Sequence, residues 1–392
     1  MKTDRVYLDW NATAPLRPAA RAAMIASLEV TGNPSSVHAE GRSARRLVEQ
    51  ARAELAGLVG AAASGVVFTS GGSEANAIAL TPGLEGAPGQ RRGRLLVSAV
   101  EHPSVLSGGR FAPTEVDVVG VDDQGRLDLA ELARRLEKHF RSGIRPLVSL
   151  MLANNETGVI QPIAETAELV HGCDGLLHVD AVQAAGRFDI DIGRLGADLI
   201  TLSGHKLGGP QGVGALIRRS EAIHLSDPLI RGGGQERGWR AGTENVAAIA
   251  GFGAGAAMAR QELATEPARL AALRDRLEAG LAVIAPTTVI FGVGTKRLPN
   301  TTLFAVPGVK AATAIIALDL AGHAVSSGSA CSSGKVAPSH VLAAMGVEPS
   351  LIQGAIRVSL GYGTAADDID RFLNAWEKLI KGLSNRMKDF AA

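Results

Sequence analysis

The sequence has few cysteines, few aromatic residues and almost no net charge. Of its 392 residues only two are Cys and 14 are aromatic (nine Phe, two Tyr and three Trp), while 40 Lys and Arg balance 39 Asp and Glu to a formal charge of +1. Two cysteines can neither crosslink a chain of this size nor form a four-cysteine zinc site. Without a basic excess, electrostatic binding to nucleic acid or to a membrane surface is excluded.

Long hydrophobic runs are also absent. The apolar stretch at residues 247–259 is interrupted by glycine and is shorter than the ~20 residues that span a bilayer. Residues 1–10 contain no apolar run of signal-peptide length. We therefore expect a cytoplasmic protein in which an accessible cysteine stays a thiol. Since 46% of the residues are hydrophobic, the chain is not disordered, and its length favours a core divided between two domains.

Short apolar runs alternate with helical patterns through the first half of the chain. Seven runs have the length of buried strands, and helical patterns such as 127–140 and 163–171 separate several of them. This alternation predicts an α/β fold with a mainly parallel, seven-stranded sheet. The seven runs lie at residues 65–68, 94–100, 115–121, 145–152, 176–179, 198–202 and 214–217.

The pattern changes towards the C-terminus. Residues 245–284 form an Ala-rich helical passage, which is followed by short strand and helix patterns. We predict a large domain at residues 15–258 and a small α/β domain built from residues 1–14 and 259–392. Residues 83–93, which contain Pro88 and two Arg, are predicted to form an exposed loop. The C-terminal patterns are strands at 288–291, 302–306 and 354–360 and helices at 311–320 and 367–387, and a helix at 43–58 precedes the first sheet.

Polar residues collect directly after five of the predicted strands. Because the carboxyl ends of parallel strands meet at one edge of a sheet, where ligands bind in open α/β folds, we expect these residues to form one site. The five polar runs are residues 69–76, 101–103, 154–158, 180–183 and 203–206.

The first of these runs contains Gly71-Gly72-Ser73 and has two interpretations. It forms a phosphate cradle, in which glycines let the backbone approach and a helix N-terminus offers free N–H groups, or it forms an ordinary turn with Ser73 as the N-cap. The sequence has neither a P-loop nor a dinucleotide-binding motif after a strand, which counts against nucleotides. The glycines at residues 251–255 are interpreted as helix packing.

Lys206 and Asp180 extend the phosphate interpretation. Lys206 is either a solvated charge or a residue that forms a Schiff base with an aldehyde cofactor. Asp180 is either a structural carboxylate or the partner of a protonated ring nitrogen. A lysine, an aspartate and a phosphate cradle form the set that pyridoxal phosphate requires. His102, if it is not structural, would stack on that cofactor or carry a proton.

The two cysteines differ in their surroundings. Cys173 lies at the end of a predicted helix, and we interpret it as filler. Cys331 is surrounded by Ser, Gly and Ala, which predicts a mobile loop at about residues 325–338. This loop is either a linker that happens to contain Cys or the carrier of an accessible thiol that attacks a substrate atom held on the cofactor. The residues alone leave both possibilities open.

Ten motifs in a fixed order carry a resemblance that covers nearly the whole chain. They lie at residues 7–15, 33–38, 68–74, 101–102, 154–162, 178–183, 203–206, 232–245, 326–331 and 356–361. With them the sequence resembles the cysteine desulfurases, pyridoxal-phosphate enzymes of the class V aminotransferase group. The loop around Cys331 favours the branch that serves iron–sulfur cluster assembly, nitrogenase and thiolation pathways.

The resemblance implies a type I pyridoxal-phosphate fold, a homodimer with sites at the subunit interface, and no metal. Sulfur would be removed from L-cysteine, giving L-alanine and a persulfide on Cys331 that passes to an acceptor such as an iron–sulfur scaffold protein. Lys206 would carry the cofactor and move the substrate α-proton, while His102 would stack on the ring and assist.

The same resemblance implies which residues bind the cofactor and the substrate. Asp180 would pair with the ring nitrogen and Gln183 with the phenolic oxygen. Asn155 and Arg357 would bind the substrate carboxylate, Asn155 also lying at the cofactor. The phosphate would be held by Gly72, Ser73, Ser203 and His205, with Thr243 reaching it from the partner subunit.

Three departures from the family pattern and three alternatives remain. Ser73 stands where many relatives have Thr, Trp10 replaces a more usual Tyr, and residues 334–340 lack an acidic residue before Pro338. The alternatives are a selenocysteine lyase or cysteine sulfinate desulfinase, another class V transaminase, and a non-catalytic scaffold for cluster assembly. Cys331 argues against a transaminase, which needs no thiol, and the intact Lys206 argues against a scaffold.

Overall fold

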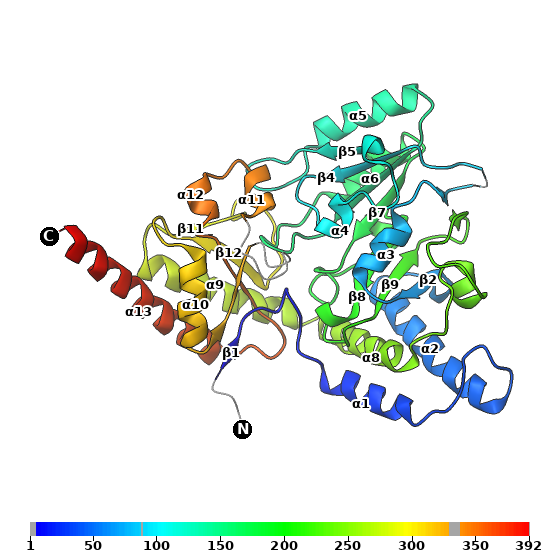
Figure 1. Cartoon of the computed structure of the whole chain (residues 1–392), viewed down its shortest axis with the longest axis horizontal. Helices are drawn as coiled ribbons and strands as arrows, with labels where there is room; N and C mark the ends of the chain where they lie inside the picture. The colour runs from blue at the N-terminus through cyan, green and yellow to red at the C-terminus, as the bar shows by residue number, and fades with distance from the viewer. Residues whose placement is uncertain (1–4, 88, 329–337, 392) are drawn as a thin grey trace.

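The largest element of the protein is a seven-stranded sheet with the order β2-β9-β8-β7-β6-β4-β5 (Figure 1). A computed structural model describes residues 5–87, 89–328 and 338–391, with side chains to residue 383. Strands β5, β4, β6, β7 and β8 are parallel, whereas β9 is antiparallel to both β8 and β2. The predicted mainly parallel sheet is confirmed. Its strands are β2 (Val66–Thr69), β4 (Arg94–Ser98), β5 (Val116–Val119), β6 (Pro146–Met151), β7 (Leu176–Asp180), β8 (Leu199–Ser203) and β9 (Gly214–Arg218).

Helices cover both faces of this sheet because its strands are apolar on both sides. Alternate residues enter different cores: Leu96 packs with α2, α5, α6 and α8, whereas Leu95 and Val97 pack with α3 and α4. A Cβ on Gly253 of α8 would lie 2.5 Å from Ala51 Cα, so the glycine lets α8 pack closely on α2. The helices are α2 (Ala39–Leu58), α3 (Gly72–Ala79), α4 (Pro103–Leu106), α5 (Leu129–Arg141), α6 (Ile163–His171) and α8 (Val246–Glu262).

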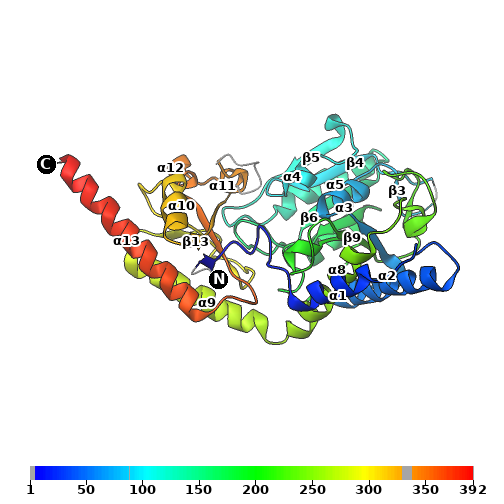
Figure 2. The ribbon, with the colours of Figure 1, turned by 60° about the horizontal axis from the view of Figure 1, so that its bottom comes forward.

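A second, four-stranded antiparallel sheet lies in the C-terminal part, with the order β11-β12-β15-β14. Its core contains Phe304, Phe372 and Trp376, together with Val6 and Leu8 from the N-terminus. Figure 2 shows α13 extending beyond this part of the molecule. The elements are β11 (Val289–Ile290), β12 (Thr301–Ala305), β14 (Ser326–Ser327), β15 (Ile356–Ser359), α9 (Glu266–Ile284), α10 (Ala311–Leu320) and α13 (Ala366–Ala391).

The N-terminal strand β1 (Val6–Tyr7) pairs in parallel with β13 (His323–Ala324), which joins the first residues to the C-terminal part. The boundaries at residues 14/15 and 258/259 stay a prediction, and α8 runs across the second of them.

No helix in the described ranges is both long and apolar enough to span a membrane. The remaining elements are α1 (Pro18–Leu28), α7 (Ile192–Leu195), α11 (His340–Ala344), α12 (Pro349–Ile352), η1 (Ala63–Gly65), η2 (Pro113–Glu115), η3 (Gly204–Lys206) and η4 (Gln235–Gly238).

The prediction of an exposed loop at residues 83–93 is wrong. Residues 83–93 do not form a wholly exposed loop, because β3 (Leu84–Glu85) pairs with β10 (His224–Leu225), and Leu84 and Arg92 are buried. The Arg92 guanidinium donates hydrogen bonds to the backbone oxygens of Leu84 and Asp174. Pro88 and two Arg are typical of solvent-exposed sequence, but here these two hydrogen bonds of Arg92 hold the segment against the protein.

Candidate active site

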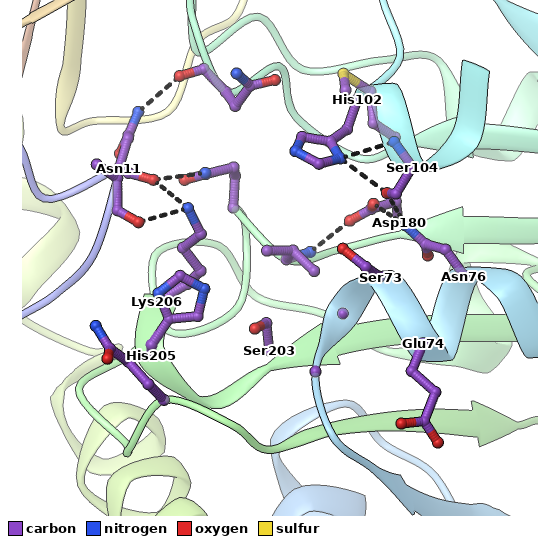
Figure 3. Close-up of a pocket in the computed structure, with 18 of the residues that line it drawn as sticks. Asn11, Ser73, Glu74, Asn76, His102, Ser104, Asp180, Ser203, His205 and Lys206 are labelled. Atoms are coloured by element: carbon purple, nitrogen blue, oxygen red, sulfur yellow. Dashed lines mark hydrogen bonds between the residues drawn. The ribbon is translucent and has the colours of Figure 1, made fainter. Parts of the chain in front are cut away.

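The polar ends of β7 and β8 and the first turns of α3 and α4 surround a cavity of about 550 Å³ (Figure 3). The residues come from segments that are far apart in the sequence, as expected for the edge of a parallel sheet. The structure thus brings together ten of the twelve predicted site residues, and their roles stay predictions. The ten are Gly72, Ser73, His102, Asn155, Asp180, Gln183, Ser203, His205, Lys206 and Arg357.

The Gly71-Gly72-Ser73 turn leads directly into α3. Helix α3 begins at Gly72 with the extended Gly71 as its N-cap, so the interpretation of Ser73 as N-cap is wrong. No described side chain caps this helix, but the Glu74 carboxylate in its first turn accepts a hydrogen bond at 3.0 Å from the N–H of Ser70, the residue before the N-cap. Since the first N–H groups of a helix have no intrahelical acceptor, those of Gly72 and Ser73 are available to a ligand in the cavity.

A side chain at Gly72 would fill the base of this cradle. An ideal Cβ there would lie 3.2 Å from Val182 Cγ2 and 3.3 Å from Ser203 Cβ, closer than most real Cβ contacts. The hydroxyls of Ser73 and Ser203 line the same cavity. Backbone N–H groups, two hydroxyls and a helix N-terminus are the donors that a phosphate group takes in proteins, so the cradle fits one.

Lys206 is held by the N-terminal segment of the chain. Its Nζ donates hydrogen bonds to the backbone oxygens of Asn11 at 2.6 Å and Ala12 at 2.8 Å. The side-chain amide of Gln183 donates to the same Asn11 oxygen at 3.0 Å. The sequence reasoning assigned no role to Asn11, although this residue lies in the motif at residues 7–15.

Asp180 and His102 are connected through Asn76 and Ser104, two residues to which the sequence reasoning assigned no role. The Asn76 amide donates to Asp180 Oδ2 and to Ser104 Oγ, each at 2.9 Å. The Val182 N–H donates to Asp180 Oδ1 at 3.0 Å. The Ser104 N–H donates to Nδ1 of His102, so this nitrogen is an acceptor and the ring proton lies on Nε2. Asn76 ends the polar run at residues 69–76, a signal that could have identified it.

Burial changes the titration of three groups around the cavity. Burial lowers the pKa of His178 to about 4, and burial together with Lys206 lowers the pKa of His205 to about 4. Burial and the charge of Asp180 raise the pKa of Glu101 well above its usual range, against the lowering effect of a hydrogen bond from the Met151 N–H. At neutral pH the two imidazoles are therefore uncharged.

Arg357 reaches the cavity from the second sheet. It is almost fully buried, its Nη2 forms an ion pair with Asp9 at 2.7 Å, and its Nη1 donates to the Asn155 backbone oxygen at 2.9 Å. Within the described residues its Nε has no acceptor. A buried guanidinium N–H without an acceptor is costly, so this donor suits an anionic group entering the cavity.

The sequence of the chain is similar to those of known proteins over nearly its whole length. The family model described as aminotransferase class-V matches residues 6–372. The chain belongs to the class-V aminotransferase family. The cysteine desulfurase of Cereibacter sphaeroides is 42% identical to it, covering 97% of each chain. The cysteine desulfurase NifS of Azotobacter vinelandii is 39% identical, over 97% of this chain and 94% of its own. The resemblance to cysteine desulfurases is confirmed.

The fold of the chain is shared with a solved relative. A NifS-like protein from Rickettsia africae superimposes with a TM-score of 0.86 at 37% identity, covering 96% of this chain and 99% of its own. The predicted fold class is confirmed. Of the other two predicted site residues, Thr243 is exposed in the segment before α8 and does not line the cavity, whereas Cys331 lies outside the described residues.

Proposed function

We propose that this member of the class-V aminotransferase family is a cysteine desulfurase that uses pyridoxal 5′-phosphate. The observation that carries the proposal is one cavity lined by the Lys206 amine, the Asp180 carboxylate and the α3 cradle, in a chain whose relatives include the cysteine desulfurases of Cereibacter sphaeroides and Azotobacter vinelandii. An amine, a carboxylate and a phosphate cradle fit this cofactor. When bound, it supplies an electron sink for the negative charge that develops at the substrate α-carbon.

The sheet edge holds the cofactor. The N–H groups of Gly72 and Ser73 and the hydroxyls of Ser73 and Ser203 bind the phosphate, with neutral His205 beside them. The Asp180 carboxylate accepts a hydrogen bond from the ring nitrogen and keeps it protonated. The Gln183 amide N–H, which donates to the Asn11 backbone oxygen in this structure, would donate to the phenolic oxygen of the cofactor instead. In the proposed homodimer, Thr243 of each subunit contacts the phosphate in the other subunit's cavity.

Lys206 and His102 handle protons. Lys206 Nζ takes the proton from the substrate α-carbon, and the backbone oxygens of Asn11 and Ala12 then accept hydrogen bonds from its ammonium form. His102 would stack on the ring of the bound cofactor, with its own ring proton on Nε2. The Ser104 N–H keeps this ring orientation by occupying Nδ1.

Arg357 and Asn155 bind the substrate. The guanidinium binds the carboxylate of L-cysteine, and its Nε gains the acceptor that it lacks among the described residues. Because Arg357 is also bonded to the Asn155 backbone, the two residues orient the substrate together. This contact explains why an amino acid, rather than a simple thiol, is the substrate.

Cys331 takes the sulfur. Its thiolate forms an S–S bond to the substrate sulfur while the substrate C–S bond breaks and the electron pair stays on the β-carbon. Protonation of the β-carbon and return of the proton from Lys206 to the α-carbon give L-alanine. The described residues on either side of the segment support this role. Ser326 pairs with Arg357 in the second sheet, and Ser339 donates a hydrogen bond to Glu156, beside Asn155. The chain therefore enters and leaves this segment next to the carboxylate-binding residues.

The decisive test is Cys331→Ala, with Cys173→Ala as the matched control. Cys173 is only partly buried and packs against the main core, away from the cavity. We expect Cys331→Ala to keep the yellow cofactor but to release no sulfide or alanine from L-cysteine, whereas Cys173→Ala keeps the parent rate. Sulfide release by Cys331→Ala at the parent rate would contradict the mechanism.

Parallel assays separate the alternatives. Turnover of selenocysteine or cysteine sulfinate by Cys331→Ala, without turnover of cysteine by the parent, would favour the lyase or desulfinase. A parent that binds no cofactor and turns over none of the three would favour the scaffold. The homodimer, the sulfur-acceptor protein and the cytoplasmic location stay predictions of this proposal.

A further inference from the structure

The segment at residues 232–245 is fixed to the large sheet by a buried ion pair. Glu236 accepts two hydrogen bonds of 2.9 Å from the Arg52 guanidinium and one of 2.8 Å from the Phe68 N–H. Glu236 and Arg237 have left-handed backbone angles, with φ of 47° and 55°. Such strain persists only where the surroundings hold it, so the segment has a defined position beside β2, the strand that leads to the phosphate cradle.

A second contact joins the same segment to the cradle itself. Arg240 Nε donates to Glu74 Oε1 at 3.0 Å, while Glu74 Oε2 accepts from the Ser70 backbone and hydroxyl. Both side chains are largely buried. Glu74 lines the cavity with Gly72 and Ser73, and its side chain is directed away from Lys206 and His102 (Figure 3).

The carboxylate of Glu74 has two opposite effects on the cradle. It accepts hydrogen bonds from the backbone and hydroxyl of Ser70, which keeps the turn before α3 in shape. It also places a negative charge in the first turn of α3, where the proposed function places a phosphate dianion, and like charges repel. Burial raises the pKa of Glu74, but hydrogen bonds from Ser70 and Arg240 outweigh burial and lower it, so the carboxylate is charged at neutral pH.

We propose that Arg240 cancels the charge of Glu74 and thereby sets the affinity of the α3 cradle for a phosphate dianion. The inference rests on the proposed function, because it takes the cradle to bind the phosphate of the cofactor. Glu74 and Arg240 are positioning residues. Glu74 shapes the turn, and Arg240 keeps that carboxylate from weakening anion binding.

The sign of the effect distinguishes this proposal from a purely structural ion pair. If the pair only holds the loop, then removing either partner weakens cofactor binding. If the charge of the pair sets the phosphate affinity, then removing Arg240 lowers this affinity and removing the charge of Glu74 does not. Arg240→Gln leaves Glu74 uncompensated and weakens phosphate binding, whereas Glu74→Gln leaves a positive charge and an amide oxygen that can still accept from the Ser70 N–H.

The experiment titrates the purified full-length chain with pyridoxal 5′-phosphate and with pyridoxal, which lacks the phosphate, and follows the absorption of the bound cofactor. We expect Arg240→Gln to weaken binding of pyridoxal 5′-phosphate on the order of tenfold and to leave pyridoxal binding within twofold of the parent. Glu74→Gln binds pyridoxal 5′-phosphate at least as tightly as the parent, and the double variant returns close to parental affinity. The effect of Arg240→Gln shrinks as salt is added.

Controls make the result decisive. Arg240→Lys keeps the positive charge, so we expect it to keep the affinity for the phosphate. This variant still tests the proposal if Arg240→Gln folds poorly. Glu278→Gln removes the partner of Arg297 (2.9 Å), a pair outside the residues that line the cavity, and leaves both affinities unchanged. Weaker phosphate binding by Glu74→Gln, or equal losses for pyridoxal and its phosphate in Arg240→Gln, would overturn the inference. A parent chain that binds neither compound would instead overturn the proposed function.

Discussion

The two sides of the cavity are held together in different ways. On the sheet side, Asp180, Asn76, Ser104 and His102 bond to one another, and all four belong to the seven-stranded sheet and its helices. On the opposite side, Arg357 comes from the second sheet and depends on residues outside it. The hydrogen-bond network around Asp180 is thus complete within one sheet and its helices, whereas the contacts of Arg357 form only when the two sheets pack.

The N-terminal segment joins the two sides. Asp9 forms the ion pair with Arg357, and the Asn11 side chain donates to Thr301 of the second sheet at 2.9 Å. The backbone oxygen of Asn11 accepts from Lys206 on the first sheet. Damage to the sheet side should therefore change the cofactor and its chemistry, and damage to the opposite side should change substrate affinity. The following four variants test this difference.

Asp180→Asn should have the largest effect. The new oxygen can keep the Val182 N–H bond, but the neutral amide places an NH₂ group against the Asn76 NH₂ and no longer stabilises a protonated ring nitrogen. We expect kcat for cysteine desulfuration to fall about 10²–10³-fold with KM little changed, measured by steady-state alanine release. A loss smaller than tenfold would remove Asp180 from the role assigned to it.

His178→Gln tests the burial of β7, the strand that carries both His178 and Asp180. Because the pKa of His178 falls to about 4 on folding, the unfolded chain binds a proton between about pH 6.5 and 4 that the folded protein does not. The free energy of unfolding is therefore unaffected by the titration of His178 above pH 6.5. As the pH falls towards 4, protonation of His178 in the unfolded chain lowers the free energy of unfolding by roughly 3 kcal/mol. Both ring nitrogens bond to hydroxyls, of Ser149 and Thr201.

We expect His178→Gln to flatten the fall in the free energy of unfolding between pH 6.5 and 4, measured by urea denaturation at several pH values. His224→Gln, at an exposed position, is the control and should keep the parental slope. An unchanged slope in His178→Gln would show that acid sensitivity arises elsewhere in the protein.

Arg357→Lys tests the opposite side. Lysine has the charge but not the planar fork, so it cannot bind a carboxylate through two parallel N–H groups. We expect KM for cysteine to rise about 10–100-fold, while the affinity for pyridoxal 5′-phosphate stays within twofold of the parent. A loss of cofactor rather than of substrate affinity would break the distinction between the two sides.

Ser104→Ala should have the smallest effect. The hydroxyl accepts from Asn76 and lies 2.8 Å from His102 Nδ1, but the Ser104 backbone N–H also donates to this nitrogen and remains in the variant. We expect a loss of about 0.5–1.5 kcal/mol in stability and a decrease in activity of only a few fold. An activity loss as large as that of Asp180→Asn would mean that the hydroxyl, rather than the backbone, orients His102.

The sequence was a good guide wherever the signal was local. The helices at residues 163–171 and 311–320 were predicted with the bounds of α6 and α10. In α6 apolar residues repeat every three to four positions, whereas α10 is rich in Ala and Leu, which favour helices. The sequence misled where side chains make distant contacts. Residues 83–93 looked exposed, but Arg92 bonds to the Asp174 backbone. Ser73 looked like an N-cap, but Glu74 reaches back to Ser70.

By itself, the sequence determined that strands alternate with helices and that polar residues follow the strands, since both patterns are written in neighbouring residues. From this it followed that Lys206, Asp180 and His102 meet at one edge. Only the tertiary structure decided that the Asn11 backbone holds Lys206, that Asn76 links Asp180 to His102, and that Arg240 compensates Glu74. These contacts join residues about 100–200 positions apart, and the direction of a hydrogen bond at that separation depends on how the sheets and helices pack rather than on any local pattern.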